Sequence, residues 1–178
     1  MSDADAAPIA EERAVPHVVV MGVSGSGKTT IGALIADELG VPFVDGDGLH
    51  PIENVRKMAA GTPLTDEDRW PWLQTVGERL ATSGGGLVIA CSALRRVYRN
   101  AILTEAPATV FVHLAGTLDV LRERMEGRSG HFMPPSLLAS QLETLEPLAD
   151  DEPGFVLDIA RPVDELVRQA VDGVRARV

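Results

Sequence analysis

Cysteine, aromatic side chains and long hydrophobic runs are all scarce in this 178-residue sequence. Its one cysteine, Cys91, excludes an internal disulfide and is typical of a reducing compartment such as the cytoplasm. No apolar stretch approaches the roughly 18 residues of a transmembrane helix, and residues 1–14 lack the apolar segment of a secretory signal. We therefore expect a cytoplasmic protein without a membrane partner. Residues 1–15 should form a disordered tail, and residues 16–178 a single domain.

Positive charge is also scarce, because 26 acidic residues outnumber 16 lysines and arginines and leave a net charge of −10. Nucleic-acid binding needs clustered positive charge for counterion release, so this balance argues against a nucleic-acid partner. The hydrophobic content of 45% and the charged content of 24% are those of an ordinary soluble globular enzyme.

The most informative segment that is present is the glycine-rich stretch from Gly22 to Thr29, directly after the apolar run 17–21. It fits the pattern G-x-x-x-x-G-K-[ST], in which glycines let backbone N–H groups face phosphate oxygens. A chance match in a glycine-rich turn is the alternative, but a buried strand before it and a helical pattern after it favour nucleoside triphosphate binding. The residues expected to hold ATP phosphates here are Gly22, Ser24, Gly25, Ser26, Gly27, Lys28, Thr29 and Thr30.

Beside such a loop, two groups of basic residues gain meaning. Arg95, Arg96 and Arg99 form one group; Arg122, Arg124 and Arg128, with His131 nearby, form the other. Either group alone is as compatible with a solvated basic surface as with a site. In an acidic protein that binds a highly anionic nucleotide, we expect them to bind anions.

Short apolar runs alternate with amphipathic stretches along the chain, which predicts a parallel sheet built from βα units. The expected strands are 18–21, 42–45, 87–91, 110–114 and 155–159. The expected helices are 28–39, 51–60, 66–83, 95–103, 118–125, 135–145 and 163–177. This pattern predicts an α/β fold of three layers, with a five-stranded parallel sheet flanked by helices. Residues 127–135 combine glycines, an arginine and two prolines, which predicts a closing lid over about residues 126–136.

Two carboxylates follow the second expected strand, in the segment Asp45-Gly-Asp47-Gly-Leu-His50. Because ligands of parallel sheets bind beyond the carboxyl ends of the strands, these acids should lie near the phosphate loop. We expect Asp47 to orient or deprotonate a phosphoryl acceptor, and Asp45 to support Mg²⁺ through water. An Asx-turn or a helix cap is the alternative for this pair.

The next segments offer further polar candidates. Thr65 and Asp68 resemble a capping box at the start of a helix, within which Arg69 serves either the helix surface or a substrate carboxylate. Ser92, at the end of the third strand, offers a hydroxyl and backbone groups where many P-loop hydrolases have a metal-supporting acid. The neighbouring Cys91 is expected to be a buried, inert thiol.

Together these segments resemble the P-loop small-molecule kinases related to shikimate and adenylate kinases. Within that group they resemble the gluconokinases of the short, thermoresistant type. The resemblance spans nearly the whole chain after the tail and rests on the motifs GVSGSGKTT, DGDGLHP, NVRKMAAGTPLTDEDRWPWL, CSALRRVYRN, GRSGHFMPPSLLASQLETLEP and VLDIARPVDEL. It implies transfer of the ATP γ-phosphate to the 6-hydroxyl of D-gluconate, with ATP and Mg²⁺ as cofactors and a homodimeric enzyme.

The resemblance also implies roles for individual residues. Lys28, Asp47 and Arg128 would act in catalysis, and Thr29 and Asp45 at Mg²⁺. Arg124, Arg128, Arg161 and Pro162 would complete the nucleotide site. The sugar-acid pocket would contain Asp47, His50, Arg69, Ser92, Arg95 and His131. The chain departs from the family pattern at Thr29, where serine is frequent, at Arg95, where lysine is common, and at Asn100, where an acid is usual.

Other functions remain as alternatives. A kinase for another small hydroxy acid, shikimate above all, would carry a glycine triplet at the end of the third strand, where this chain has Cys91-Ser92-Ala93. A non-catalytic nucleotide-binding protein would lack the acceptor-site acid or the lid arginines, whereas Asp47, Arg124 and Arg128 are all present.

Overall fold

The computed structural model describes residues 14–126 and 135–178. Five parallel strands form one sheet in the order β2-β3-β1-β4-β5. Their bounds are β1 (His17–Met21), β2 (Phe43–Asp45), β3 (Leu87–Ala90), β4 (Val110–Ala115) and β5 (Gly154–Asp158). The five predicted strands are confirmed, each to within about one residue at its ends.

Seven α-helices lie within the described residues. They are α1 (Lys28–Leu39), α2 (Ile52–Ala59), α3 (Asp66–Thr82), α4 (Arg96–Glu105), α5 (Leu118–Glu126), α6 (Pro135–Thr144) and α7 (Val163–Arg175). All seven were predicted. A short 3₁₀-helix, η1 (Gly46–Leu49), was not, because one turn of this type has no periodic hydrophobic pattern.

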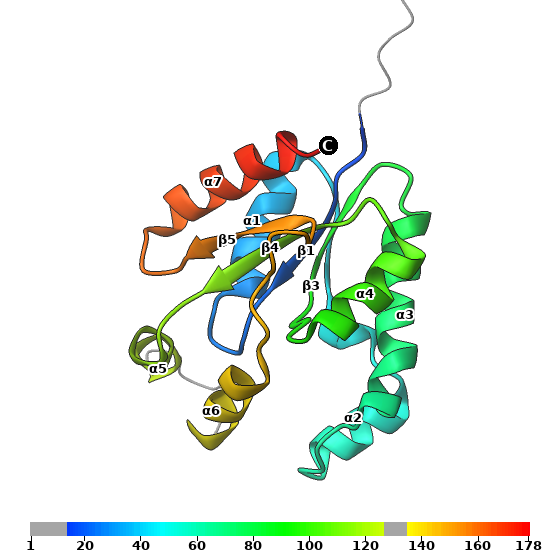
Figure 1. Ribbon diagram of the computed structural model, residues 1–178, viewed down its shortest axis with the longest axis vertical. Coiled ribbons are helices and arrows are strands. Elements are labelled where there is room, and N and C mark those ends of the chain that lie inside the picture. The colour runs from blue at the N-terminus through cyan, green and yellow to red at the C-terminus, as the bar shows by residue number, and fades with distance from the viewer. Residues whose placement is uncertain (1–13, 127–134) are drawn as a thin grey trace, which may run out of the picture.

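The helices cover both faces of the sheet, which confirms the three-layer fold. Figure 1 shows α1 and α7 on one face and α3 and α4 on the other. Alternate residues of β1 serve the two faces, because side chains of a strand point to opposite sides. Val18 and Val20 pack with Ile31 and Ile35 of α1, whereas Val19 belongs to the core under α3 and α4.

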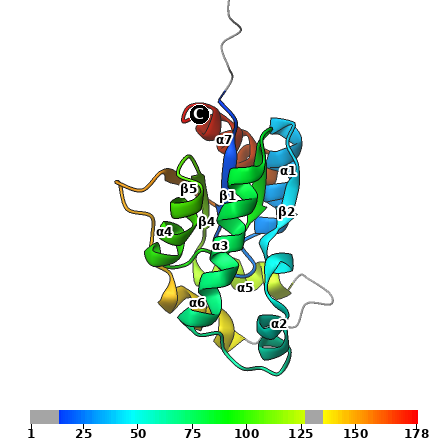
Figure 2. The same cartoon turned by 90° about the vertical axis from the view of Figure 1, so that its right-hand side faces the viewer.

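Both views place α2, α5 and α6 at one end of the molecule (Figures 1 and 2). The strand arrows point toward this end, and the start of β1 and the chain's C-terminus lie at the other (Figure 1). Ligands of parallel sheets bind at the carboxyl ends of the strands. The helices that rise beyond this edge therefore surround the place where a site is expected. None of the helices in the described ranges is long and apolar enough to cross a membrane.

The start of α3 confirms the predicted capping box. Thr65 Oγ1 accepts the N–H of Asp68 at 3.2 Å, and Asp68 Oδ2 accepts the N–H of Thr65 at 2.9 Å. This cap fixes where α3 begins and therefore which residues of its first turns face the site. The two tryptophans separate, because Trp72 is buried in the core while Trp70 is 38% exposed.

Candidate active site

The loop between β1 and α1 has the backbone shape of a phosphate-binding loop. Gly25 and Gly27 take left-handed conformations, with φ of 81° and 92°, and Gly27 is the N-cap of α1. Residues with a side chain would be strained there, so glycine is what allows this tight turn. The N-terminus of α1 follows at once, and its first N–H groups have no partners within the helix. Loop and helix end together can bind an anion.

Ser26 can take part in this loop through its backbone alone. Its side chain is fully buried, and Oγ lies 2.8 Å from the position that a Cβ on Gly22 would occupy. Among the described residues this hydroxyl has no hydrogen-bond partner. The N–H of Ser26 donates to the carbonyl of Val23 at 3.2 Å, so a phosphate contact at this residue stays a prediction. Thr30, two residues into the helix after Lys28, is exposed.

Lys28 and Thr29 link the loop to its surroundings in two directions. Lys28 Nζ donates to the carbonyl of Val23 at 3.0 Å and so lies across the loop. Thr29 Oγ1 donates to Asp45 Oδ2 at 3.3 Å, which joins the start of α1 to the end of β2. Thr29 and Asp45, the two residues predicted at Mg²⁺, are thus brought into contact.

This pair is the kind of donor set that suits Mg²⁺ beside a nucleotide. Mg²⁺ prefers oxygen ligands and commonly takes only one or two from the protein, the others being water and phosphate. Within residues 14–126 and 135–178, no cluster of three or more His, Cys, Asp or Glu side chains could hold a metal ion. A metal ion that is shared with the phosphates of a nucleotide fits the oxygens of Thr29 and Asp45.

The helix η1 carries Asp47, and hydrogen bonds fix its first two residues, Gly46 and Asp47. Asp45 is its N-cap, and Asp45 Oδ1 accepts the N–H of Asp47 at 3.0 Å. The carbonyl of Gly46 accepts the buried indole N–H of Trp72 at 2.8 Å. The cap interpretation of Asp45 is therefore confirmed, while its other carboxylate oxygen bonds to Thr29. Its place at Mg²⁺ stays a prediction. The Asp47 side chain itself is exposed at the site edge.

His50, at the end of η1, is fixed in position by stacking and by a hydrogen bond. Its ring lies on the indole of Trp72, with 4.0 Å between ring centroids and 17° between planes. Asn54 Nδ2 lies 3.2 Å from His50 Nδ1 and donates to the carbonyl of Asp68 at 2.8 Å. Because Nδ2 is a donor group, Nδ1 of His50 is the acceptor and Nε2 carries the proton.

The charge state of His50 follows from its surroundings. Burial lowers the pKa of His50 below its usual value of 6.5, the Arg69 guanidinium lowers it further, and Asp47 opposes both. The imidazole is therefore neutral at pH 7 and can donate from Nε2 without carrying charge. Such a group suits a substrate hydroxyl better than a substrate carboxylate.

Asp66 accepts hydrogen bonds from three side chains, and the sequence analysis did not identify it. Its Oδ1 accepts the Tyr98 hydroxyl at 2.6 Å and Arg69 Nη1 at 3.3 Å, and its Oδ2 accepts Arg95 Nη1 at 2.8 Å. The guanidinium carbons of the two arginines lie 5.4 and 5.6 Å from the centre of the Tyr98 ring. Arg69 of α3 and Arg95, the residue before α4, therefore converge on one carboxylate and one ring. The start of a helix, where acids are favoured, was the available signal for Asp66.

The electrostatics of this cluster keep it charged. The hydrogen bond from Tyr98 lowers the pKa of Asp66, and the charges of Arg95 and Arg69 lower it further. Burial and the hydrogen bond to Asp66 raise the pKa of Tyr98. Because Arg95 also pairs with Glu146, the two arginines face two carboxylates and the cluster carries no net positive charge. What it offers the carboxylate of a substrate is guanidinium N–H donors.

The arginines predicted as one anion-binding group have different partners. Arg95 also donates from Nε to Glu146 at 3.2 Å, and Arg96 pairs with Asp151 at 2.5 Å. Arg99 is fully buried and paired with a carboxylate of the segment before β5, so the prediction that it binds an anionic ligand is wrong. These arginines surround the first turn of α4, where neighbours in sequence point in different directions.

The end of β3 lies directly against the phosphate loop. The carbonyl of Ser92 accepts the N–H of Gly22 at 3.3 Å. Cys91 is buried, and burial raises the pKa of its thiol to about 12. The buried position confirms that Cys91 is a core residue. Because the thiol stays protonated at neutral pH, it is expected to be inert.

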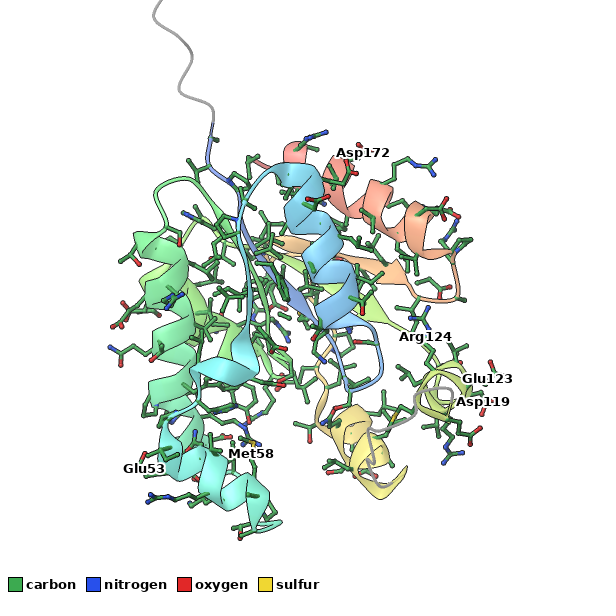
Figure 3. All side chains as sticks on the ribbon, turned by 180° about the vertical axis from the view of Figure 1, so that it is seen from behind. Glu53, Met58, Asp119, Glu123, Arg124 and Asp172 are labelled. Carbon is green, nitrogen blue, oxygen red and sulfur yellow. The ribbon has the colours of Figure 1, made fainter. Side chains whose placement is uncertain are left out.

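On the nucleotide side, Arg124 of α5 reaches toward the end of β5 (Figure 3). Its Nη2 donates to the carbonyl of Ile159, and its Nη1 lies 3.4 Å from where a Cβ on Gly27 would be. Arg124 thus connects the phosphate loop with the loop between β5 and α7. In that loop, Arg161 pairs with Glu165 at 2.6 Å and Pro162 caps α7.

One contact to the phosphate loop could not be anticipated. Gln141 Oε1, on α6, accepts the N–H of Ser24 at 2.7 Å, although 117 residues separate the two in sequence. Arg128 and His131 lie outside the described residues, as does most of the predicted lid. Their placement in the site stays a prediction.

Comparison with protein families matches residues 24–152 to a model described as shikimate kinase. The thermoresistant gluconokinase of Escherichia coli (strain K12) is 40% identical over 161 residues, which cover 88% of this chain and 92% of that protein. The gluconokinase of Gluconobacter oxydans is 50% identical over 139 residues, or 76% and 78% of the two chains.

Solved structures agree with this relationship. The crystal structure of a gluconokinase from Sinorhizobium meliloti 1021 is 52% identical, has a TM-score of 0.84, and covers 90% of this chain and 92% of its own. The shikimate kinase of Aquifex aeolicus is 16% identical, with a TM-score of 0.57 and coverage of 90% and 96%. At that identity the likeness shows the shared fold alone.

Proposed function

We propose that this chain, which belongs to the gluconokinase family, transfers the γ-phosphoryl group of ATP to the 6-hydroxyl of D-gluconate, forming 6-phosphogluconate and ADP. The observation that carries the proposal is the contact between the phosphate loop and the acidic segment after β2. Thr29 bonds to Asp45, and Asp45 caps the helix that carries Asp47. An acceptor hydroxyl beside Asp47 would therefore meet the γ-phosphate end of the loop.

Mg-ATP would be held by the loop and the residues around it. The backbone N–H groups of Gly25, Gly27 and the first residues of α1, together with the Lys28 ammonium, would neutralise the phosphates. Thr29 would ligate Mg²⁺, with Asp45 acting through water. The ion supplies positive charge at the oxygens of the transferred phosphoryl group. Arg124 lies over the loop, and the segment of Arg161 and Pro162 would pass beside the adenine.

D-gluconate carries one carboxylate and several hydroxyls, so its pocket needs cations together with short polar groups. We assign Asp47 to orient the 6-hydroxyl and to accept its proton as the bond to phosphorus forms. Positioning contributes more than proton removal, because the transition state is loose. The neutral His50 suits a hydroxyl, while the pair formed by Arg69 and Arg95 suits the carboxylate. Ser92, in the loop after β3, lies against the phosphate loop at Gly22.

The finer features of this proposal come from the family. Arg128 and His131 are assigned to a lid that would exclude water from the γ-phosphate, and Arg128 would also stabilise the transferred charge. A cytoplasmic homodimer is expected, without nucleic-acid or membrane partners. Size-exclusion chromatography with light scattering measures the oligomeric state directly, and a monomer at micromolar concentration would contradict the dimer.

The first experiment is ADP release from Mg-ATP with D-gluconate, shikimate, glycerate, AMP or buffer alone. Rapid release with D-gluconate alone is the expected result. Release with another acceptor instead would keep the kinase and reject the gluconate pocket. If no acceptor stimulated ADP release while ATP still bound, a non-catalytic nucleotide-binding protein would be favoured.

The second experiment removes the Asp47 carboxylate. In Asp47→Ala, kcat is expected to fall by about 10²–10⁴-fold, the range typical of a general acid–base group, while the Kd of ATP stays nearly unchanged. Asp172→Ala, at an exposed acid of α7 far from the carboxyl ends of the strands (Figure 3), is the matched control and should retain wild-type kinetics. Near-normal turnover of Asp47→Ala would remove this residue from the mechanism.

A further inference from the structure

Ala93, in the loop between β3 and α4, is strained. Its φ is 44°, which makes it the one residue with a side chain at positive φ among the described residues. A residue with a Cβ adopts this conformation at a cost that corresponds to a factor of about 5–30 in population. Ala93 is 1% exposed, so it cannot relax into solvent. Some other group must hold this peptide in place.

Arg99 supplies that contact. Its guanidinium is fully buried, and Nη1 donates to the carbonyl of Ala93 at 2.9 Å. The other two nitrogens of the guanidinium, Nε and Nη2, donate to the carboxylate of Glu152 at 2.7 and 3.0 Å. Glu152 Oε2 also accepts the N–H of Ala149 at 2.9 Å. The segment before β5 thus fixes the guanidinium, and the guanidinium in turn fixes the strained peptide.

The charges around this contact favour its ionised form. Burial acts to raise the pKa of Glu152, but the hydrogen bonds from Arg99 and Ala149 outweigh it and the pKa is lowered. Burial and the Arg99 charge lower the pKa of His113 to about 4, so the imidazole is neutral at pH 7. Arg99 and Glu152 therefore form a charged, bidentate pair with no second cation competing from His113.

The strained peptide lies between two parts of the proposed site. On one side, the carbonyl of Ser92 accepts the N–H of Gly22, the first residue of the phosphate loop. On the other side, Arg95 reaches Asp66 in the proposed gluconate pocket. A loop that relaxed at Ala93 would move both contacts, because they are one and two residues away.

We propose that Arg99 is a positioning residue, which holds the carbonyl of Ala93 and so keeps the 91–95 loop in the shape that serves the phosphate loop and the substrate pocket. Arg99 touches neither substrate. The part that concerns D-gluconate rests on the proposed function, whereas the part that concerns the loop does not.

The kinetic test uses Arg99→Lys, which keeps the charge and loses the fork that reaches Glu152 and Ala93 together. The KM for D-gluconate is expected to rise by about 5–30-fold, the factor that corresponds to the released strain. The Kd of ADP should rise as well, because the same loop holds Gly22 of the phosphate loop through the carbonyl of Ser92. Arg168→Lys, at an exposed pair with Asp164 on α7, is the control and should leave the KM unchanged.

A second substitution separates positioning from general stability. Ala93→Gly removes the Cβ and with it most of the cost of positive φ. In this background, Arg99→Lys should raise the KM by less than about threefold, because the loop no longer needs to be held. An equal loss in both backgrounds would overturn the proposal, since Arg99 would then act on stability alone.

Amide hydrogen exchange tests the loop without any substrate. The N–H of Gly22 bonds to Ser92, and the N–H of Cys91 bonds to Val20 in the neighbouring strand. Arg99→Lys should speed exchange at Gly22 by about tenfold and leave Cys91 unchanged. Equal acceleration at both amides would mean global destabilisation and would overturn the proposal. If the wild-type protein failed to phosphorylate D-gluconate, this measurement would still decide the role of Arg99.

Discussion

Gly46, directly before Asp47, is the position where one added methyl group should disturb catalysis most clearly. A Cβ built on Gly46 lies 2.4 Å from the carbonyl oxygen of Ala90 and 3.4 Å from Cys91 Cβ. The nearest atom is backbone of a central strand, which cannot rotate away. Ordinary contact begins near 3.4 Å, so η1 must move by roughly 1 Å. Such a shift in a group that positions substrate can cost about 10²-fold in rate.

Two quantities should change in Gly46→Ala. We expect kcat with D-gluconate to fall about 10²-fold, while the Kd of ATP stays near the wild-type value because the phosphate loop is not touched. Overpacking of this kind costs about 1–3 kcal/mol in stability, which lowers Tm by about 2–4 °C per kcal/mol in a domain of this size. Steady-state kinetics, calorimetric titration with ATP and a thermal melt measure these effects on one preparation.

Gly48→Ala is the matched control on the other side of Asp47. A Cβ on Gly48 meets no atom within 4 Å, and its φ is outside the strained range. This variant should keep wild-type turnover. Its free energy of unfolding should rise by up to about 1 kcal/mol, because alanine lowers the conformational entropy of the unfolded chain. The reasoning is refuted if Gly46→Ala turns over within about threefold of wild type, or if both variants lose activity equally.

Three further predictions concern other parts of the molecule. The Cys91 thiol, with its pKa raised to about 12, should resist alkylation in the folded protein at pH 8 and react once the protein is unfolded in urea. The Lys57 ammonium and the backbone of the capping box lower the pKa of Asp68 from 3.8 to about 2. Asp68→Asn should therefore lower the free energy of unfolding at pH 7, and the difference from wild type should vanish as pH falls from 3.8 through about 2. Trp72→Phe leaves the carbonyl of Gly46 unpaired and should lower the free energy of unfolding by about 1–3 kcal/mol. Trp70→Phe, at a 38% exposed ring, should change it by less than about 0.5 kcal/mol. Equal urea midpoints for the two variants would contradict this prediction.

Much of the fold could be predicted because its signals are local. Apolar runs and amphipathic stretches follow the periods of strands and helices, so each element can be recognised from its own residues. The phosphate loop is equally local, since its glycines and Lys28 lie within seven residues. The box formed by Thr65 and Asp68 spans four residues. In each case the interacting groups are close in sequence, and the chain's own geometry brings them together.

The sequence by itself determined the layered α/β architecture, the phosphate loop and the acid pair after β2. Tertiary structure alone decided that Asp66 and Tyr98, 32 residues apart, join two arginines, and that Arg99 turns inward to Glu152, 53 residues away. Side chains of one helical turn point in different directions, so a cluster of arginines in sequence does not specify a cluster in space. Which partner each charge meets depends on how separate elements pack, and no local pattern records that.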